Sequence, residues 1–244
     1  MKFNLAISPL NIAKRLTLGV VVLTILSVIF ATGNYVFGYN PEWTKMLNLD
    51  REMNFPTWYS ALMLGFASFL LRAIALGKAL EHNRFYPQWK LLAKIFVFLA
   101  IDEVLSIHEI LIIPDLRKAL NLPGIFYSVW VIPGIIVVVI FLKKYWKFTQ
   151  HLPKRSRFHF MLAAMLYIGG ALGMEMVGGL YAHLQGKQNI VYALIANLEE
   201  VMEMMGIIVF IYGLLYYMGK WQDNFQLEVK VTGVNSNSQS CLVE

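Results

Sequence analysis

The chain has 244 residues, of which 58% are hydrophobic and 15% are charged, and its mean hydropathy of +0.57 lies well above that of soluble domains. The formal net charge is +6, but Lys and Arg lie between apolar stretches and form no basic face with interleaved aromatic residues, which argues against nucleic-acid binding. The one cysteine, Cys241, stands in a polar tail, which excludes a disulfide framework and a cysteine-ligated metal.

The apolar stretches are long enough to cross a hydrocarbon core of about 30 Å, which takes roughly 20 helical residues. We therefore predict an all-α, polytopic membrane protein whose main partner is the lipid bilayer, with residues 1–218 forming a bundle of six transmembrane helices. In chain order, the spans are expected at about 16–37, 54–76, 89–113, 124–146, 158–184 and 190–218.

The first span begins after Lys14 and Arg15, as the apolar core of a secretory signal does. Its apolar region is longer than such a core, so we predict that the helix is retained. Pro133 lies inside the fourth span and predicts a kink there. Residues 219–244 are polar and bury too little apolar surface to fold, which predicts a disordered tail.

Lys and Arg accumulate in alternate connections between the spans. The rich set comprises the N-terminal stretch, the 77–90 connection and the 143–157 connection, whereas the intervening connections hold two, two and one of these residues. Because Lys and Arg in short loops mark the cytoplasmic side, both termini are predicted to be cytoplasmic. We expect the membrane to be the plasma membrane.

Ionisable residues inside the spans are the most informative feature, because each costs a few kcal/mol to insert. On a helix, Asp102 and Glu109 stack on one face, with Ser106 between them. Glu199, Glu200 and Glu203 share one broad stripe of the sixth span. With the predicted orientation, these residues and Glu175 of the fifth span all lie between the midplane and the outer surface.

Together with Glu103, these residues make seven carboxylates. They need a compensating positive charge, because close like charges cannot all be ionised. Arg72, the one basic residue well inside a span, lies near the cytoplasmic end, on the wrong side of the cluster. A divalent metal or a set of titrating protons would supply this charge. We predict a divalent metal, and the oxygen-rich ligands favour Fe, Mn, Zn, Mg or Ca. The predicted ligands are Asp102, Glu103, His108, Glu109, Glu175, Glu199, Glu200 and Glu203, with Glu52 and His183 as a possible rim.

Gly169 and Gly173 have the spacing of a small-xxx-small motif, which lets a neighbouring helix approach closely. Such an approach would bring the short side chain of Glu175 within reach of ligands on that helix. Simple helix packing is the more common meaning of the motif.

Three classes of function fit these features. The first is a metal-dependent membrane enzyme, whose ion activates water or polarises a lipid-phase substrate. The second is a transporter that couples proton or cation movement to the same carboxylates, although the spans show no obvious inverted repeat. The third is an assembly or scaffold protein that contacts its partner through the tail.

Three strings, Leu49 to Trp58, Asp102 to Glu109 and Glu199 to Met204, carry a resemblance to a known family. Together they resemble a family of bacterial six-span membrane proteins without an assigned activity, over about residues 16–218. The resemblance implies that the three strings form one site. It implies no reaction, substrate or oligomeric state.

Overall fold

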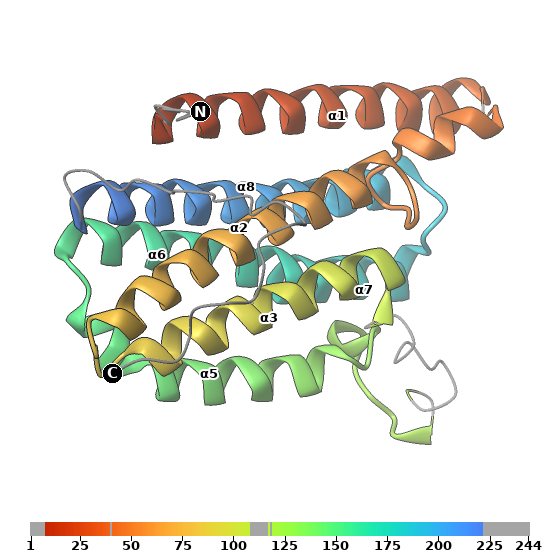
Figure 1. The fold of residues 1–244 in the computed structure, drawn as a ribbon. Coiled ribbons are helices and arrows are strands. Elements are labelled where there is room, and N and C mark those ends of the chain that lie inside the picture. Colours follow the sequence, from red (N-terminus) through yellow and green to blue (C-terminus); the bar gives the residue numbers. More distant parts are fainter. Residues whose placement is uncertain (1–7, 40, 108–116, 118, 222–244) are drawn as a thin grey trace, which may run out of the picture.

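A computed structural model of the protein describes residues 8–39, 41–107, 117 and 119–221, and the described part contains helices and no strands (Figure 1). The elements are α1 (Pro9–Phe37), the 3₁₀ helix η1 (Glu42–Leu47), α2 (Phe55–Leu80), α3 (Tyr86–Leu105), the 3₁₀ helix η3 (Gly124–Phe126), α5 (Val131–His151), α6 (Lys154–Ile168), the π-helical segment η4 (Gly169–Met174), α7 (Glu175–Gln185) and α8 (Ile190–Trp221). The predicted all-α class is confirmed.

Local sequence signals set several helix ends. The side chain of Asn54 accepts a hydrogen bond from the backbone N–H of Thr57 at 3.1 Å, which caps the start of α2. Asn189 caps the start of α8 in the same way, because its Oδ1 accepts a hydrogen bond from the backbone N–H of Tyr192 at 2.9 Å. Gly38 ends α1 in the left-handed conformation, with a φ of 67°.

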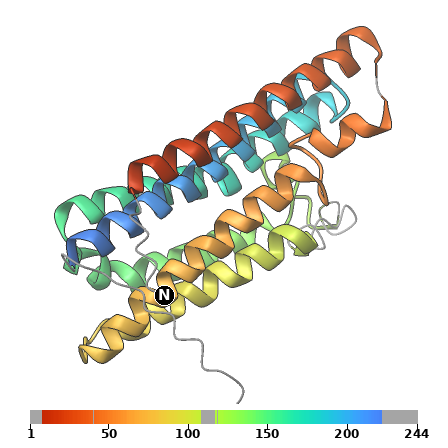
Figure 2. The ribbon, with the colours of Figure 1, turned by 45° about the horizontal axis from the view of Figure 1, so that its top comes forward.

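Helix α8 is the centre of the bundle, because α1, α2, α6, η4 and α7 all pack against it. Figures 1 and 2 both show α1 and α6 lying along α8, and α2 lying along α3. Segments α6, η4 and α7 run on as one rod from Lys154 to Gln185. On α5, the Tyr145 hydroxyl donates to the Gln88 carbonyl of α3 at 2.9 Å.

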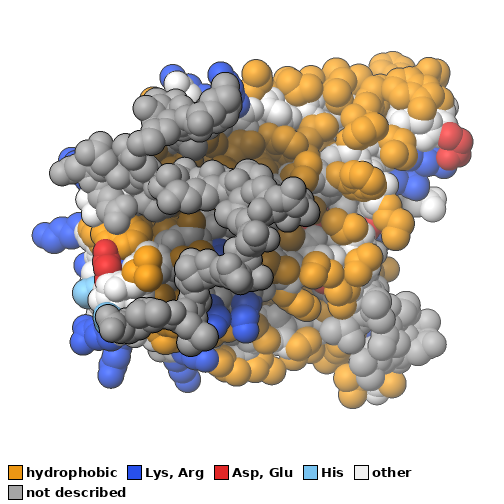
Figure 3. Space-filling model, viewed as in Figure 1, with side chains coloured by type: hydrophobic (Ala, Val, Ile, Leu, Met, Phe, Trp, Pro, Cys, Tyr) orange, Lys and Arg blue, Asp and Glu red, His pale blue; other side chains and the backbone are white. Residues whose placement is uncertain are grey.

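The core follows the helical repeat of α2 and α8. Leu64, Leu71 and Ile74 of α2 are fully buried, as are Ile211 and Leu214 of α8. The outer faces of the helices remain apolar and exposed, and Figure 3 shows hydrophobic side chains spread along the length of the bundle. Contiguous apolar surface on this scale is typical of a lipid-facing protein.

Four of the helical rods are long and apolar enough to cross a membrane: Pro9–Phe37, Phe55–Leu80, Lys154–Gln185 and Ile190–Trp221. Helices α3 and α5 cover much of the third and fourth predicted spans but carry more charge. Lys90, Lys94, Asp102 and Glu103 fall within α3. The structure therefore supports a membrane protein with four candidate spans.

The third predicted span, 89–113, is wrong as one continuous helix. Helix α3 ends at Leu105, because Ser106 takes the left-handed conformation with a φ of 49°. The predicted stacking of Asp102, Ser106 and Glu109 on one helix face therefore does not hold at Ser106. His108 and Glu109 lie outside the described residues.

The fourth predicted span, 124–146, also begins too early. Gly124–Phe126 form the 3₁₀ helix η3, and α5 starts only at Val131. Pro133 consequently lies in the first turn of α5, where its missing N–H removes no helical hydrogen bond. The predicted kink within the span is thus wrong.

At the other end of the chain, α8 continues to Trp221, and residues 222–244 lie outside the described residues.

A cation clamp fastens the end of α8 to α2. The ammonium group of Lys78 lies 3.8 Å from the centre of the Trp221 ring and 2.9 Å from Oε2 of Glu81. The Trp221 Nε1–H donates to Oε1 of Glu81 at 2.8 Å, and the indole lies against Gly77, which has no side chain to block it. Lys78 is buried, so the clamp supplies the partners that its charge requires.

Replacing Trp221 with alanine should lower the free energy of unfolding in detergent by about 2 kcal/mol, because a shielded cation–π contact and a charged hydrogen bond are both lost. Thermal unfolding followed by circular dichroism measures the change. Trp58→Ala is the matched control, since Trp58 is 63% exposed. Equal melting temperatures for the two variants would show that the clamp does not hold α8.

Candidate functional site

The π-helical segment η4 interrupts the α6–α7 rod where the rod meets the glutamates of α8. A Cβ on Gly170 would lie 2.9 Å from the carbonyl oxygen of Glu199 and 3.1 Å from the backbone nitrogen of Glu203. Only glycine permits this approach of the two backbones. Single π-helical turns occur frequently at functional sites, and this one leads directly into Glu175, the first residue of α7.

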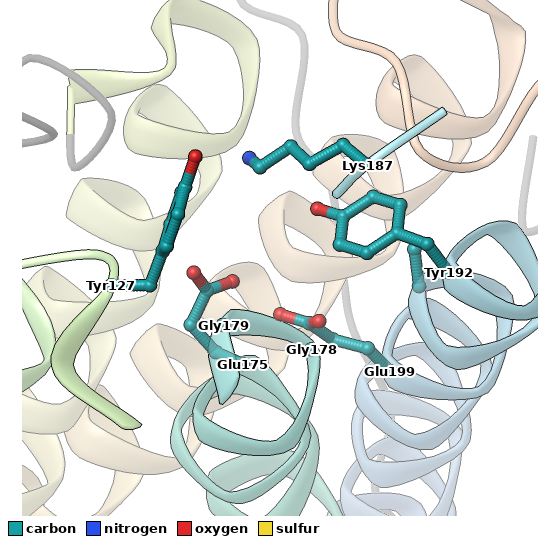
Figure 4. A pocket seen from close by; sticks show the side chains of 8 residues that line it. Tyr127, Glu175, Gly178, Gly179, Lys187, Tyr192 and Glu199 are labelled. Carbon is teal, nitrogen blue, oxygen red and sulfur yellow. The ribbon is translucent and has the colours of Figure 1, made fainter. Parts of the chain in front are cut away.

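A small pocket lies at this junction. It is lined by Tyr127, Glu175, Gly178, Gly179, Lys187, Tyr192, Ala196 and Glu199. Figure 4 shows the carboxyl groups of Glu175 and Glu199 directed into the space between the Tyr127 and Tyr192 rings. Its volume is about 10 Å³, which has room for about one water molecule.

The two carboxyl groups line the same pocket, so each lies in the electrostatic field of the other. They come from different helices, with Glu175 on α7 and Glu199 on α8. Two carboxyl groups placed so close together disfavour the ionisation of both, because like charges repel. The arrangement is therefore suited to binding a proton between two helices.

Lys187 and two tyrosines form the rim of the pocket. The Lys187 ammonium group lies 5.2 Å from the Tyr127 ring centre and 5.5 Å from that of Tyr192. Within the described residues, the ion pairs are Lys45–Glu42 and Lys78–Glu81, so Lys187 makes none there. Lys187 therefore places one positive charge near the Glu175–Glu199 pair without forming an ion pair with either carboxyl group.

Further carboxylates continue from the pocket into the bundle. Glu203 lies one helical turn beyond Glu199 on α8 and interacts electrostatically with Glu175, Glu103 and Asp102. Glu200 interacts in the same way with Glu203 and Glu103. The structure therefore brings the acidic residues of α3, α7 and α8 into one region.

The predicted metal centre is wrong for the part of the chain that the structure describes. There, no group of three or more His, Cys, Asp or Glu side chains could hold a metal ion. Electrostatic neighbours across α3 and α8 need not share an ion. The break at Ser106 also removes the helical stacking on which the α3 part of the prediction rested.

The two predicted rim residues lie apart from the Glu175–Glu199 pair. Glu52 is exposed in the connection before α2, although its charge acts on Glu203. His183 is exposed near the end of α7, where Nδ1 lies 3.3 Å from the Arg117 guanidinium and the ring packs against Gly124. His183 therefore helps to position η3 and does not line the pocket.

The sequence prediction missed Tyr127, Tyr192 and Lys187 as pocket residues. One signal was available for Tyr192, because Tyr192, Ala196 and Glu199 follow one another at helical spacing and so share a face of α8. No local pattern marks Tyr127, which reaches the pocket because η3 packs against α7 at Gly179.

A family model described as "Domain of unknown function (DUF8692)" matches residues 15–218. The chain has no match among curated proteins or among solved structures. The match extends from the start of α1 almost to the end of α8, so it includes every residue of the pocket and of the carboxylate region that the structure describes. The expectation of a family without an assigned activity is thereby confirmed, and the chain belongs to the DUF8692 family.

Proposed function

We propose that this protein is a proton-coupled membrane transporter in which the Glu175–Glu199 pair binds and releases the coupled proton. The observation that carries the proposal is that the two carboxyl groups, one from α7 and one from α8, point into one pocket (Figure 4). Two adjacent carboxyl groups are rarely both ionised, and in the proposed function they share one proton as carboxyl dyads do. Loss of that proton leaves two like charges in the pocket and alters the contact between α7 and α8.

The arrangement of the other carboxylates supports a path for protons. Glu203 lies about 6 Å further along α8 than Glu199, at about 1.5 Å of rise per residue. Beyond it, Glu103 and Asp102 of α3 lie within electrostatic range. Chains of acidic residues inside a bundle are the usual proton relays of pumps and transporters. The pocket, with its room for one water, would be the outer end of this relay.

The proposal includes six membrane spans, with α3 and α5 crossing beside the four candidate spans. Helix α5 presents Ile136, Val137 and Ile140 to the surface, each more than half exposed, which suits contact with lipid. Its lysines lie in its last three turns, at the same end as the Arg84 connection and the start of α6. This Lys- and Arg-rich end would face the cytoplasm, placing both termini there and the pocket toward the outside of the plasma membrane.

The decisive experiment reconstitutes the full chain in liposomes that carry an internal pH-sensitive dye and applies a pH gradient. The Glu199→Gln variant should move protons at least about 100-fold more slowly than the unmodified protein, the lower range for loss of a proton-transferring group. Glu42→Gln is the matched control, because Glu42 is exposed on η1 and pairs with Lys45 outside the bundle.

Infrared spectroscopy separates proton binding from transport. The unmodified protein should show the C=O band of a protonated, hydrogen-bonded carboxyl group, and Glu199→Gln should lose that band while it remains folded. A protein with the band but no proton movement would keep the proton site and overturn transport. Absence of the band in the unmodified protein would overturn the shared proton itself.

A further inference from the structure

An open cleft lies at the Lys- and Arg-rich end of the bundle, away from the carboxylate pocket. It is lined by Arg84 and Phe85 from the connection before α3 and by Lys147, Gln150 and His151 from the end of α5. Its volume is about 470 Å³, within the range of sites that bind small organic molecules. Figure 3 shows Lys and Arg side chains gathered at this end of the molecule.

Aromatic rings hold the walls of the cleft in place. The Arg84 guanidinium lies 4.6 Å from the centre of the Phe85 ring, and the His151 ring lies 4.5 Å from the same ring. Phe85 is buried and packs edge-on against Phe148 at 5.8 Å. The packed rings of Phe85 and Phe148 therefore hold the cationic side chains in place where α3 and α5 meet.

The cleft cations have no acidic partner among the described residues. The ion pairs formed there are Lys45–Glu42 and Lys78–Glu81, which leaves Arg84 and Lys147 without one. Glu81, the acidic residue closest in sequence to Arg84, is already bound to Lys78 and Trp221. The chemistry of the cleft therefore fits an anion that comes from outside the described chain.

Position and size favour a lipid phosphate over a free phosphate ion. Lys147 and His151 are four residues apart and share one stripe of α5, and the adjoining stripe carries the exposed side chains of Leu142 and Trp146. This apolar stripe leads from the cleft toward the membrane interior, as acyl chains would. The cleft is also several times larger than a phosphate ion, which leaves room for a glycerol head group.

We propose that this cleft binds the head group of an anionic phospholipid in the inner leaflet. Arg84 and Lys147 hold the phosphate, and the acyl chains lie along Leu142 and Trp146 of α5. Basic pockets between membrane helices on the cytoplasmic side bind anionic lipids by this chemistry. Because the lipid bridges the α2–α3 connection and α5, its binding also fastens α5, which packs sparsely against the rest of the bundle.

The test titrates the full chain in mild detergent with phosphatidylglycerol and counts bound lipid by native mass spectrometry. The double variant Arg84→Gln/Lys147→Gln should bind about 25-fold more weakly, because each cation near an anionic lipid contributes about a fivefold change in affinity. The matched control is Lys14→Gln/Arg15→Gln, which removes two exposed cations from α1 at the same end of the bundle. It should bind phosphatidylglycerol as the unmodified protein does.

Other arms of the experiment distinguish the lipid from its alternatives. Phosphatidylcholine should bind far more weakly than phosphatidylglycerol, and inorganic phosphate should not displace the lipid. If the double variant unfolds, Lys147→Gln alone replaces it, with an expected loss of about fivefold. Equal binding by the cleft and control variants, equal binding of the two lipids, or displacement by inorganic phosphate would each overturn the proposal.

Discussion

Replacing Gly206 with alanine should reduce the free energy of unfolding by about 3 kcal/mol, the upper part of the range for overpacking a helix contact. A Cβ at this position would lie 2.7 Å from the backbone nitrogen of Tyr167 and 3.0 Å from the carbonyl oxygen of Ala163. Both atoms belong to the backbone of α6, so no side-chain rotation can relieve the clash. The central helix would have to move away from α6 along their shared interface.

Gly65→Ala is the matched control for this substitution. Gly65 also lies inside a helix, but a Cβ there meets nothing within 4 Å. Alanine should therefore stabilise α2 by up to about 1 kcal/mol through its greater helix propensity. Denaturation of both variants in mixed detergent micelles, followed by circular dichroism, gives the two free energies. A Gly206→Ala variant as stable as Gly65→Ala would mean that α6 and α8 do not pack as closely as the structure shows.

The membrane character of the chain was predictable, because it depends on apolar length alone. The first, second, fifth and sixth predicted spans each lie almost entirely within a long apolar rod. Some rods extend past the predicted limits, as α2 does at residues 77–80. Helix α8 begins at the predicted Ile190, directly after the Asn189 cap. Hydropathy predicts the length of an apolar segment, whereas capping residues determine where the helix begins and ends.

The limits of the third span were not predictable from hydropathy. The stretch 110–113 keeps a sliding window apolar in spite of His108 and Glu109, so hydropathy does not mark the left-handed Ser106. Such a conformation depends on tertiary contacts that a local pattern does not contain. Because the helical stacking of Asp102 with Glu109 assumed an unbroken helix, the error in the span carried over into the predicted metal site.

The acidic residues of the candidate site were found from the sequence, but their chemistry was not. Intramembrane charge singled out Glu175 and Glu199 correctly as neighbours, and it left open whether a metal or a proton compensates them. That choice depends on the distance between carboxyl groups on different helices. The structure places Glu175 and Glu199 in one pocket, where one proton would suffice for the pair.

The close approach of α8 to the glycine-rich stretch was predicted at Gly169 and Gly173, but the structure places it at Gly170. Gly173 has open space where its Cβ would be, and Gly169 faces only the flexible end of Met202 at 3.1 Å. The π-helical turn accounts for the difference, because it changes which residues of η4 face α8. Helical arithmetic on a regular α-helix could not anticipate that rotation.

Gly170→Ala should therefore reduce both stability and proton binding. Its Cβ would lie 2.8 Å from Cγ of Glu203 and 2.9 Å from the carbonyl oxygen of Glu199, which forces η4 away from α8. We expect a loss of about 2–3 kcal/mol in unfolding free energy. Separation of Glu175 from Glu199 should follow, because Glu175 begins α7 directly after η4.

Gly173→Ala tests whether this effect depends on the contact with α8 or merely on losing a glycine from η4. It lies in the same segment but meets nothing within 4 Å, so the variant should be at least as stable as the unmodified protein and should show the same infrared band. In Gly170→Ala, the band of the shared carboxyl proton should shift or vanish even under conditions where the variant is fully folded. A folded Gly170→Ala protein with an unchanged band would show that η4 does not position the pair, and that the carboxyl contact is maintained by α7 and α8 alone.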